Sequence, residues 1–142
     1  MSGAGVLVVH GRGRAGAAAL AEGARLARAG QLELTVLAFA PQDTDPAVCG
    51  VYTEAFNEGV RAQALDELAE ARRLLGEDGT SARYVLLDGR DGALESWAGA
   101  EGFAIILLAR SGALGLRGRR RAGRLRRVGS EVRLLGPESS PG

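Results

Sequence analysis

Lysine is absent from this sequence, and all 18 of its basic residues are arginine. The absence excludes chemistry that needs an amine, such as Walker-A phosphate binding, Schiff-base formation and catalysis by a lysine base. Cysteine and histidine occur once each, at Cys49 and His10, so no internal disulfide can form and no Cys/His cluster could hold zinc. No partner base can be named for Cys49, which favours an inert thiol over a nucleophile.

Long apolar segments are also missing. No hydrophobic run approaches the roughly 18 residues of a membrane-spanning helix, and residues 1–6 lack the basic stretch that begins a secretory leader. We therefore expect no membrane partner and a cytoplasmic location, which the single cysteine also favours. Because aromatic residues make up only 4% of the chain, leucine, valine, isoleucine and alanine must fill the core.

Charge is divided unevenly along the chain. Residues 1–109 hold 9 arginines against 15 acidic residues, a balance of −6, whereas residues 110–142 hold 9 against 2, a balance of +7. The net charge of +1 therefore conceals an acidic body with a basic C-terminal segment.

The basic segment contains arginines at 117, 119, 120, 121, 124, 126 and 127. Two interpretations stay open: these side chains bind phosphates or an acidic protein partner, or they form a solvated helix face around Ala122, Leu125 and Val128. We expect no specific nucleic-acid partner, because stacking aromatics and base-reading groups are not found nearby.

Strand-like and helix-like patterns alternate. The run from Phe103 to Ala109 has no polar alternation, which indicates a strand covered on both faces, as in parallel sheets. The expected strands are 6–9, 32–40, 83–87, 103–109 and 132–135, and the expected helices are 15–29, 53–75, 92–100 and 117–128. This order predicts an α/β domain over residues 1–136, in which four helices sandwich a doubly wound, five-stranded parallel sheet, with residues 137–142 as a flexible tail.

Ligands bind such sheets outside the carboxyl ends of the strands. His10 follows the first strand, and it carries the only imidazole of the chain. Its ordinary alternative is a strand-end residue that is hydrogen-bonded to backbone. Asp88 and Asp91 could form an acid/base pair, but loop solvation is favoured because no Ser/His pair accompanies them.

The segment after the fourth strand is spaced with glycines, at Gly112, Gly115, Gly118, Gly123 and Gly129. Glycines let the backbone approach a ligand closely, and a helix that starts there would direct free amide hydrogens and a positive dipole end at an anion.

The layout resembles the universal stress protein (UspA-type) family over about residues 4–136. The features that carry the resemblance are the order of elements, the long second helix, the turn Leu87-Asp88-Gly89-Arg90-Asp91-Gly92, and the strand that ends in Arg110-Ser111-Gly112. The resemblance implies a Rossmann-like fold of the adenine-nucleotide-hydrolase type and a small binding or signalling module that is not an efficient enzyme. It also implies ATP or another adenine nucleotide as ligand, and a homodimer built through the last strand, Val132-Arg133-Leu134-Leu135.

The resemblance also implies site residues, from which this sequence departs in two places. Nucleotide-binding members carry an acidic residue where this chain has His10, and their glycine motif is GxxG, nine residues, then Gly-Ser or Gly-Thr. Gly112 with Gly115, and Gly115 with Gly118, satisfy GxxG, but Gly129-Ser130 follows Gly118 after ten residues. We therefore expect weaker ATP binding than in members with the intact motif.

In this hypothesis, adenosine lies over His10, Gly11 and the end of the second strand near Ala38. Its phosphates meet the amides of Gly112, Gly115 and Gly118, and Gly129-Ser130 is either a further phosphate contact or the turn into the last strand. Slow ATP hydrolysis would have no general base other than His10.

Two alternatives were compared with this one. The first is a nucleotide-free interaction module that uses the basic C-terminal segment to bind a partner protein. The second is a response-regulator receiver, which Tyr84-Val85-Leu86-Leu87-Asp88 resembles. Receivers need acidic residues after the first strand and a lysine after the fifth, whereas this chain has His10-Gly11 and no lysine, and its second helix is too long.

Overall fold

The computed structural model describes residues 5–10, 13–41, 50–89, 92–109, 123–127 and 131–135. The strands are β1 (Gly5–Val9), β2 (Leu34–Pro41), β3 (Arg83–Gly89), β4 (Phe103–Ala109) and β5 (Glu131–Leu135). The helices are α1 (Gly13–Gly30), α2 (Gly50–Leu75) and α3 (Ala93–Glu101), and the 3-10 helix η1 (Gly76–Gly79) follows α2. A helical turn at 123–126 represents the fourth expected helix, and residues 117–122 and 128 of that prediction lie outside the described residues.

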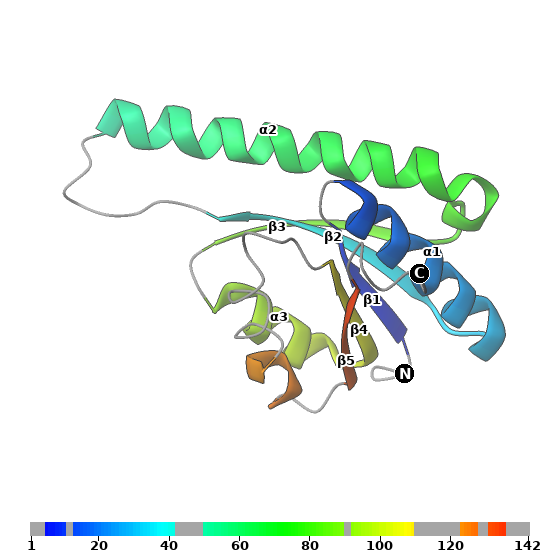
Figure 1. Ribbon diagram of the computed structural model, residues 1–142. Helices are drawn as coiled ribbons and strands as arrows, with labels where there is room; N and C mark the ends of the chain where they lie inside the picture. The colour runs from blue at the N-terminus through cyan, green and yellow to red at the C-terminus, as the bar shows by residue number, and fades with distance from the viewer. Residues whose placement is uncertain are drawn as a thin grey trace.

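The five strands form one parallel sheet in the order β3-β2-β1-β4-β5. Helices α1 and α2 lie on one face of this sheet, and α3 and the turn at 123–126 lie on the other (Figure 1). From the central β1 the chain builds outward to β2 and β3, and it then crosses to the other side of β1 for β4 and β5. The predicted doubly wound α/β sandwich is therefore confirmed.

Alternation along β1 supplies both halves of the core. Val6 and Val8 face α1 and α2, and they pack with Leu20 and Ala71. Leu7 and Val9 face the opposite way, where they pack with residues such as Leu94 of α3 and Leu125 of the helical turn. Burying one such side chain fully contributes roughly 1.5–3 kcal/mol, so a strand that is covered on both faces stabilises the fold through every residue.

Small residues let α1 lie close to β1. Ala19 and Ala27 of α1 are buried, and a Cβ built on Gly23 between them would collide with Cγ2 of Val8. A side chain at position 23 would therefore push α1 away from the sheet, and the packing in this layer depends on the glycine.

Five strand boundaries differ from the sequence prediction, three of them by one residue and two by two residues. The second strand begins at Leu34 and not at Leu32, because the backbone N–H of Leu32 donates to the carbonyl of Ala27 at 2.8 Å and closes α1. Gln31 makes this closure possible by adopting a left-handed backbone with φ of 54°. The third strand continues past its predicted end at residue 87, because Asp88 and Gly89 still pair in register with β2.

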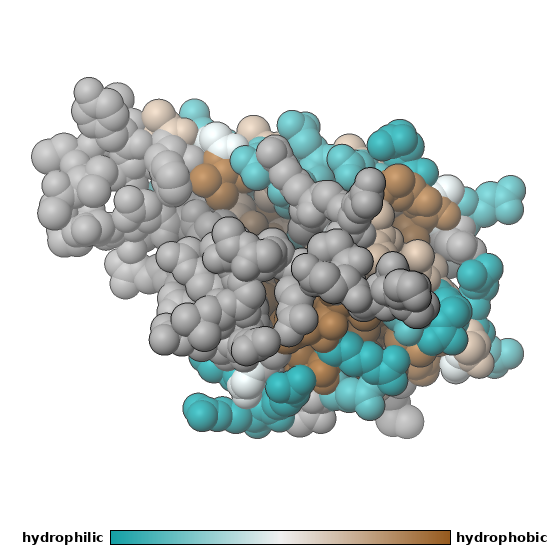
Figure 2. All heavy atoms as spheres, viewed as in Figure 1, coloured by the Kyte–Doolittle hydropathy of each residue, from teal (hydrophilic) through white to brown (hydrophobic). Residues whose placement is uncertain are grey.

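The helix α2 turns a mostly hydrophilic side outward, with small hydrophobic patches along it (Figure 2). The large apolar side chains that are exposed in the described chain are Leu65 and Leu74, at 52% and 46%. Single exposed leucines are ordinary on soluble surfaces. Among the helices of the described residues, none has the length and apolar character needed to cross a membrane.

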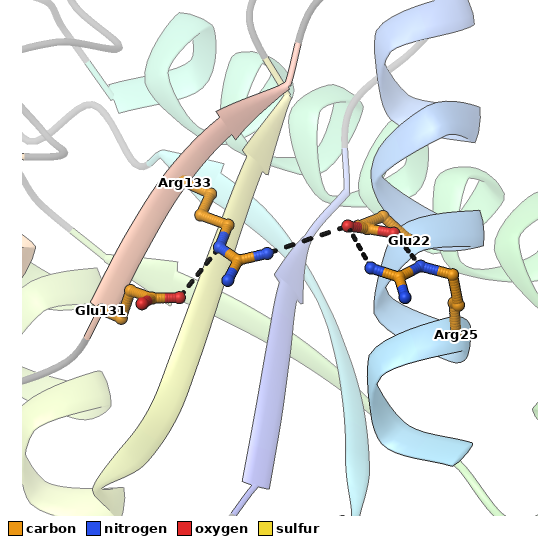
Figure 3. A network of polar contacts seen from close by, with 4 residues as sticks. All are labelled: Glu22, Arg25, Glu131 and Arg133. Atoms are coloured by element: carbon orange, nitrogen blue, oxygen red, sulfur yellow. Dashed lines mark hydrogen bonds and ion pairs between the residues drawn. The ribbon is translucent and has the colours of Figure 1, made fainter. Parts of the chain in front are cut away.

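The strand β5, at one end of the sheet, is tied to α1 by charged side chains. Arg133 lies between Glu131 of its own strand, with Nε to Oε2 at 2.8 Å, and Glu22 of α1, with Nη1 to Oε2 at 3.8 Å (Figure 3). Glu22 in turn accepts hydrogen bonds from Arg25 at 2.6 and 2.9 Å. The bond from Arg25, together with the attraction of Arg25 and Arg133, lowers the pKa of Glu22 despite its partial burial.

Candidate functional site

The order of the strands places a topological switch point at the carboxyl ends of β1 and β4. These strands are neighbours, but the chain leaves β1 for α1 on one face, and after β4 it reaches the opposite face, where Leu125 packs. The two connections therefore diverge at this edge. In open α/β sheets such a divergence is where ligands bind.

His10 lies at this divergence, directly after β1. Its backbone N–H donates to the carbonyl of Leu37 at 2.8 Å, so the hydrogen bond to backbone that the sequence analysis considered is made by the main chain of His10. The imidazole makes no such bond. His10 is only 5% exposed, yet neither Nδ1 nor Nε2 has a hydrogen-bond partner in the part of the chain that the structure describes. A buried polar atom that is left unpaired costs roughly 1–3 kcal/mol, so this arrangement requires an explanation.

Alanines lie next to His10 on the side of β2. Ala38 and Ala40 are fully buried and pack against Ala64 of α2, with Val60 and Leu68 around them. Because β1 pairs with β2 through Val9 and Leu37, Ala38 is the next residue beside His10. The predicted site residues His10 and Ala38 are thus neighbours, on a wall that is small and apolar.

Burial and nearby charge act on His10 in opposite directions. Removal from water lowers the pKa of His10 from its ordinary value of 6.5, and Glu67 and Glu70 of α2 offset this effect in part by raising it. The helix α1 begins three residues later, and its first turn has no acidic residue. The positive end of this helix therefore also disfavours a protonated His10. Burial and the helix end therefore favour the neutral imidazole over the protonated one.

Most of the other predicted site residues lie outside the described residues. These are Gly11, Gly112, Gly115, Gly118, Gly129 and Ser130, together with Asp91 and Cys49. Asp88 is described, and its Oδ2 lies 3.3 Å from Nη1 of Arg61 on α2. This half-exposed ion pair is consistent with the solvated role that the sequence favoured for Asp88.

Two arginines of the basic segment hold the chain together. Nε of Arg124 lies 3.8 Å from Oε1 of Glu95, which α3 buries against the sheet. Nη2 of Arg126 donates to the carbonyl of Val132 at 3.2 Å. These two side chains make contacts within the fold, and Arg126 and Arg127 are both exposed. Sequence reasoning could not predict the pair of Glu95 and Arg124, because these residues lie far apart along the chain.

A hollow of about 400 Å³ lies at the amino end of β2. It is bounded by the end of α1, the start of β2, η1 and the segment after η1, and the polar residues that line it include Arg28, Glu33, Glu77 and Ser81. This position is remote from the carboxyl ends of the strands. The described residues contain no group of three or more His, Cys, Asp or Glu side chains that could hold a metal ion.

Comparison with solved structures relates this geometry to known proteins. The universal stress protein UspA from Lactobacillus plantarum superposes with a TM-score of 0.72 at 16% identity, over 95% of this chain and 99% of that one. This chain has the universal stress protein fold. A member of that family from Burkholderia pseudomallei gives a TM-score of 0.67 at 16% identity, over 92% and 94% of the two chains.

A further structure with this fold is a universal stress protein in complex with cAMP, with a TM-score of 0.53 and 16% identity over 94% of this chain and 98% of that one. No protein-family model matches the sequence, and no curated protein matches it. The universal stress protein fold expected from the sequence is therefore confirmed through three-dimensional structure, at an identity where sequence comparison no longer detects it.

Proposed function

We propose that this chain is a universal-stress-protein-like binding or signalling module whose crevice at the carboxyl ends of β1 and β4 takes an adenine nucleotide. The observation that carries the proposal is the buried imidazole of His10, which has no hydrogen-bond partner among the described residues and lies at the topological switch point of the sheet. A solved protein of the same fold is in complex with cAMP, which supports the choice of ligand class.

The surroundings of His10 suit the uncharged part of a nucleotide. A neutral imidazole offers one donor and one acceptor, and the neighbouring Ala38 adds no charge beside it. The phosphates would extend toward Gly112, Gly115 and Gly118, and an arginine of the following segment would take part of the role of magnesium. The crevice would bind, and no catalytic step is assigned to it.

Calorimetry with ATP, ADP, AMP and cAMP tests the ligand. We expect binding weaker than micromolar, because His10 replaces an acidic contact and the glycine motif carries an extra residue. His10→Leu should reduce the affinity at least tenfold, whereas Glu77→Gln in the remote hollow serves as a matched control and should not change it. A sub-micromolar dissociation constant for ATP would contradict the expected weakness, and full affinity in His10→Leu would contradict the site.

The glycine loop is tested in the same titrations. Gly115→Val places a β-branched side chain where a backbone amide should approach the phosphates, so we expect nucleotide binding to be lost. Mass spectrometry of small molecules released from the purified, denatured protein would identify a ligand retained from the cell. Unchanged affinity in Gly115→Val would place the phosphates elsewhere.

The alternative of a nucleotide-free interaction module has less support. Arg124 and Arg126 contact Glu95 and the carbonyl of Val132, so fewer arginines than the sequence suggested remain for a partner. Binding of polyanions through the segment should be weak and steeply dependent on salt. Tight binding of DNA or RNA that persists at high salt would contradict this expectation.

We further propose a homodimer through β5. In the described sheet this strand pairs with β4 alone, so its other edge offers unpaired backbone groups. Glu131 and Arg133 lie exposed on the same face of the strand. In an antiparallel pairing of two copies centred on Val132, each Glu131 would lie opposite the partner's Arg133, and two such opposite-charge pairs favour this register.

A charge swap tests the dimer. Sedimentation should show a mass near twice 14.7 kDa for the natural chain, and Arg133→Glu should shift it toward the monomer because carboxylates would then face each other. The double variant Glu131→Arg/Arg133→Glu should restore the dimer, and Leu134→Arg should disrupt it. A monomeric natural chain, or a dimer that survives Leu134→Arg, would refute this interface.

A further inference from the structure

His10 sits where its two charge states differ in what they can bind. The neutral imidazole has one N–H donor and one bare nitrogen that accepts, whereas the protonated ring has two donors and no acceptor. Both nitrogens are closed off from solvent in the structure, and the ring makes no hydrogen bond within the described chain that would commit it to either state. A bound molecule can therefore favour one protonation state of the ring, and the protonation state can determine which molecule binds.

Among the described residues, the charged groups that influence His10 are carboxylates. Glu67 and Glu70 of α2 act on the ring electrostatically. The neighbouring positions on the flanking strands are Ala38 of β2 and Ala109 of β4, which carry no charge.

The described charged side chains of α1 lie in its second half and are engaged elsewhere. Glu22 and Arg25 pair with each other, and Arg28 lines the hollow at the amino end of β2. The negative charges of Glu67 and Glu70 disfavour a phosphate beside His10, and they favour an uncharged part of the ligand at this ring.

We propose that the ligand of the crevice is held by the neutral form of the His10 imidazole, so that protonation of this single side chain releases it. The inference rests on the proposed function and adds to it a proton-linked control of occupancy. Glu67 and Glu70 are part of the device, because they favour the protonated form and keep it within reach of mildly acidic conditions.

The direction of the effect follows from linkage. A ligand that binds only the neutral ring lowers the pKa of His10 further below 6.5. By reciprocity, protonation of His10 lowers the affinity for the ligand. The affinity should be constant above about pH 7 and should fall below the pKa of the free protein, by up to about tenfold per pH unit for one proton. A ligand that placed phosphate beside the ring would do the reverse.

One histidine in the chain makes the measurement direct, since the imidazole signals in an NMR spectrum belong to His10 without assignment. We would titrate these signals with and without saturating cAMP, and measure cAMP affinity at about pH 5.5 and about pH 8. A phosphodiester is the suitable probe because phosphate monoesters change charge themselves near pH about 6. We expect the midpoint of His10 to fall when cAMP binds, and the affinity to be several-fold higher at the higher pH.

Variants separate this control from general damage to the site. His10→Gln keeps a donor and an acceptor but cannot titrate near neutrality, so it should retain part of the affinity and lose the dependence on pH. Glu67→Gln removes a carboxylate that favours the protonated ring, so it should shift the pH dependence of the affinity to lower pH. Circular dichroism at both pH values checks that each variant is folded.

The outcomes distinguish the two proposals. Binding of cAMP or ATP with equal affinity at both pH values, or a midpoint of His10 that rises on binding, would overturn the proton-linked control and leave the nucleotide site standing. Absence of binding by every adenine nucleotide at every pH would overturn the proposed function and the control together.

Discussion

Two buried polar side chains, one on each face of the sheet, are treated differently by this fold. His10 at the end of β1 is 5% exposed and Glu95 in α3 is 8% exposed. Glu95 has a cation within reach, since Arg124 approaches it from the helical turn at 3.8 Å. His10 has no hydrogen-bond partner in the described chain, and the charges that it senses are the carboxylates of Glu67 and Glu70.

This difference distinguishes a structural role for Glu95 from a binding role for His10. A buried charge with a counter-charge from a distant segment fixes how those segments pack, and here it fastens the turn at 123–126 to α3. A buried polar group with no partner contributes nothing to packing that an apolar group would not supply better. Its retention makes sense if something outside the chain completes it, which is the premise of the proposed nucleotide site.

The largest expected effect on stability comes from breaking the pair of Glu95 and Arg124. Arg124→Leu leaves the Glu95 carboxylate without this cation, and we expect a loss of about 1–2 kcal/mol in the free energy of unfolding measured with urea. This is less than the roughly 3–5 kcal/mol of a fully buried pair, because Arg124 is 40% exposed and water screens the interaction.

Two further variants control this measurement. The double variant Glu95→Leu/Arg124→Leu should recover most of the loss, because the charge and its partner leave together. Arg127→Leu, on the exposed side of the same turn, should change stability by less than about 0.5 kcal/mol. Equal losses in Arg124→Leu and Arg127→Leu would show that the Glu95 pair is not what anchors the turn.

Replacing His10 should change stability in the opposite direction. His10→Leu replaces two unpaired nitrogens with apolar atoms in a similar volume, and we expect the free energy of unfolding to rise by about 1 kcal/mol. The same variant should lose nucleotide affinity, so stability and binding would move apart. A large loss of stability in urea would mean that the ring has a structural role in the fold.

Much of this fold could be predicted because burial leaves a local pattern. The run from Phe103 to Ala109 has no polar interruption, and it is β4, covered on both faces. Ala64, Ala71 and Leu75 recur at helical spacing, and they are the buried face of α2. Such signals lie within one element. The start of the second strand was missed because Leu32 is apolar like a strand residue, but its N–H is taken by the end of α1.

The candidate site was harder to predict because its defining property is an absence. The position of His10 after the first strand was visible in the sequence, and its lack of a partner was not, since this depends on what α2 and β2 bring beside it. Ala38 and Ala64 are ordinary core alanines in the sequence, and only their approach makes a narrow apolar wall. The contacts of Glu95 and Glu22 join distant segments, for which spacing along the chain carries no signal.

A smaller effect should appear in the pH dependence of stability. The pKa of His10 is lowered in the folded chain relative to 6.5, so the unfolded chain takes up a proton more readily. The stabilisation is fully present above pH 6.5, and it is lost as the pH falls from 6.5 through the lowered pKa. Urea unfolding at a series of pH values should show this decline in the natural chain, and His10→Leu should lack it. An identical decline in both proteins would assign it to other groups.

The smallest effect should come from the exposed network that joins β5 to α1. Glu22→Gln removes the carboxylate that Arg25 and Arg133 share, and all three side chains are more open to water than Glu95 (Figure 3). The lowered pKa of Glu22 means that its contribution is present above pH 4.5 and is lost as the pH falls through that lowered value. We expect a slight loss of stability at low ionic strength that disappears at about 1 M salt, where the screening length is only about 3 Å. A loss as large as that of Arg124→Leu, or one that persists in salt, would mean that exposed and buried ion pairs contribute alike to this fold, contrary to the distinction drawn between them.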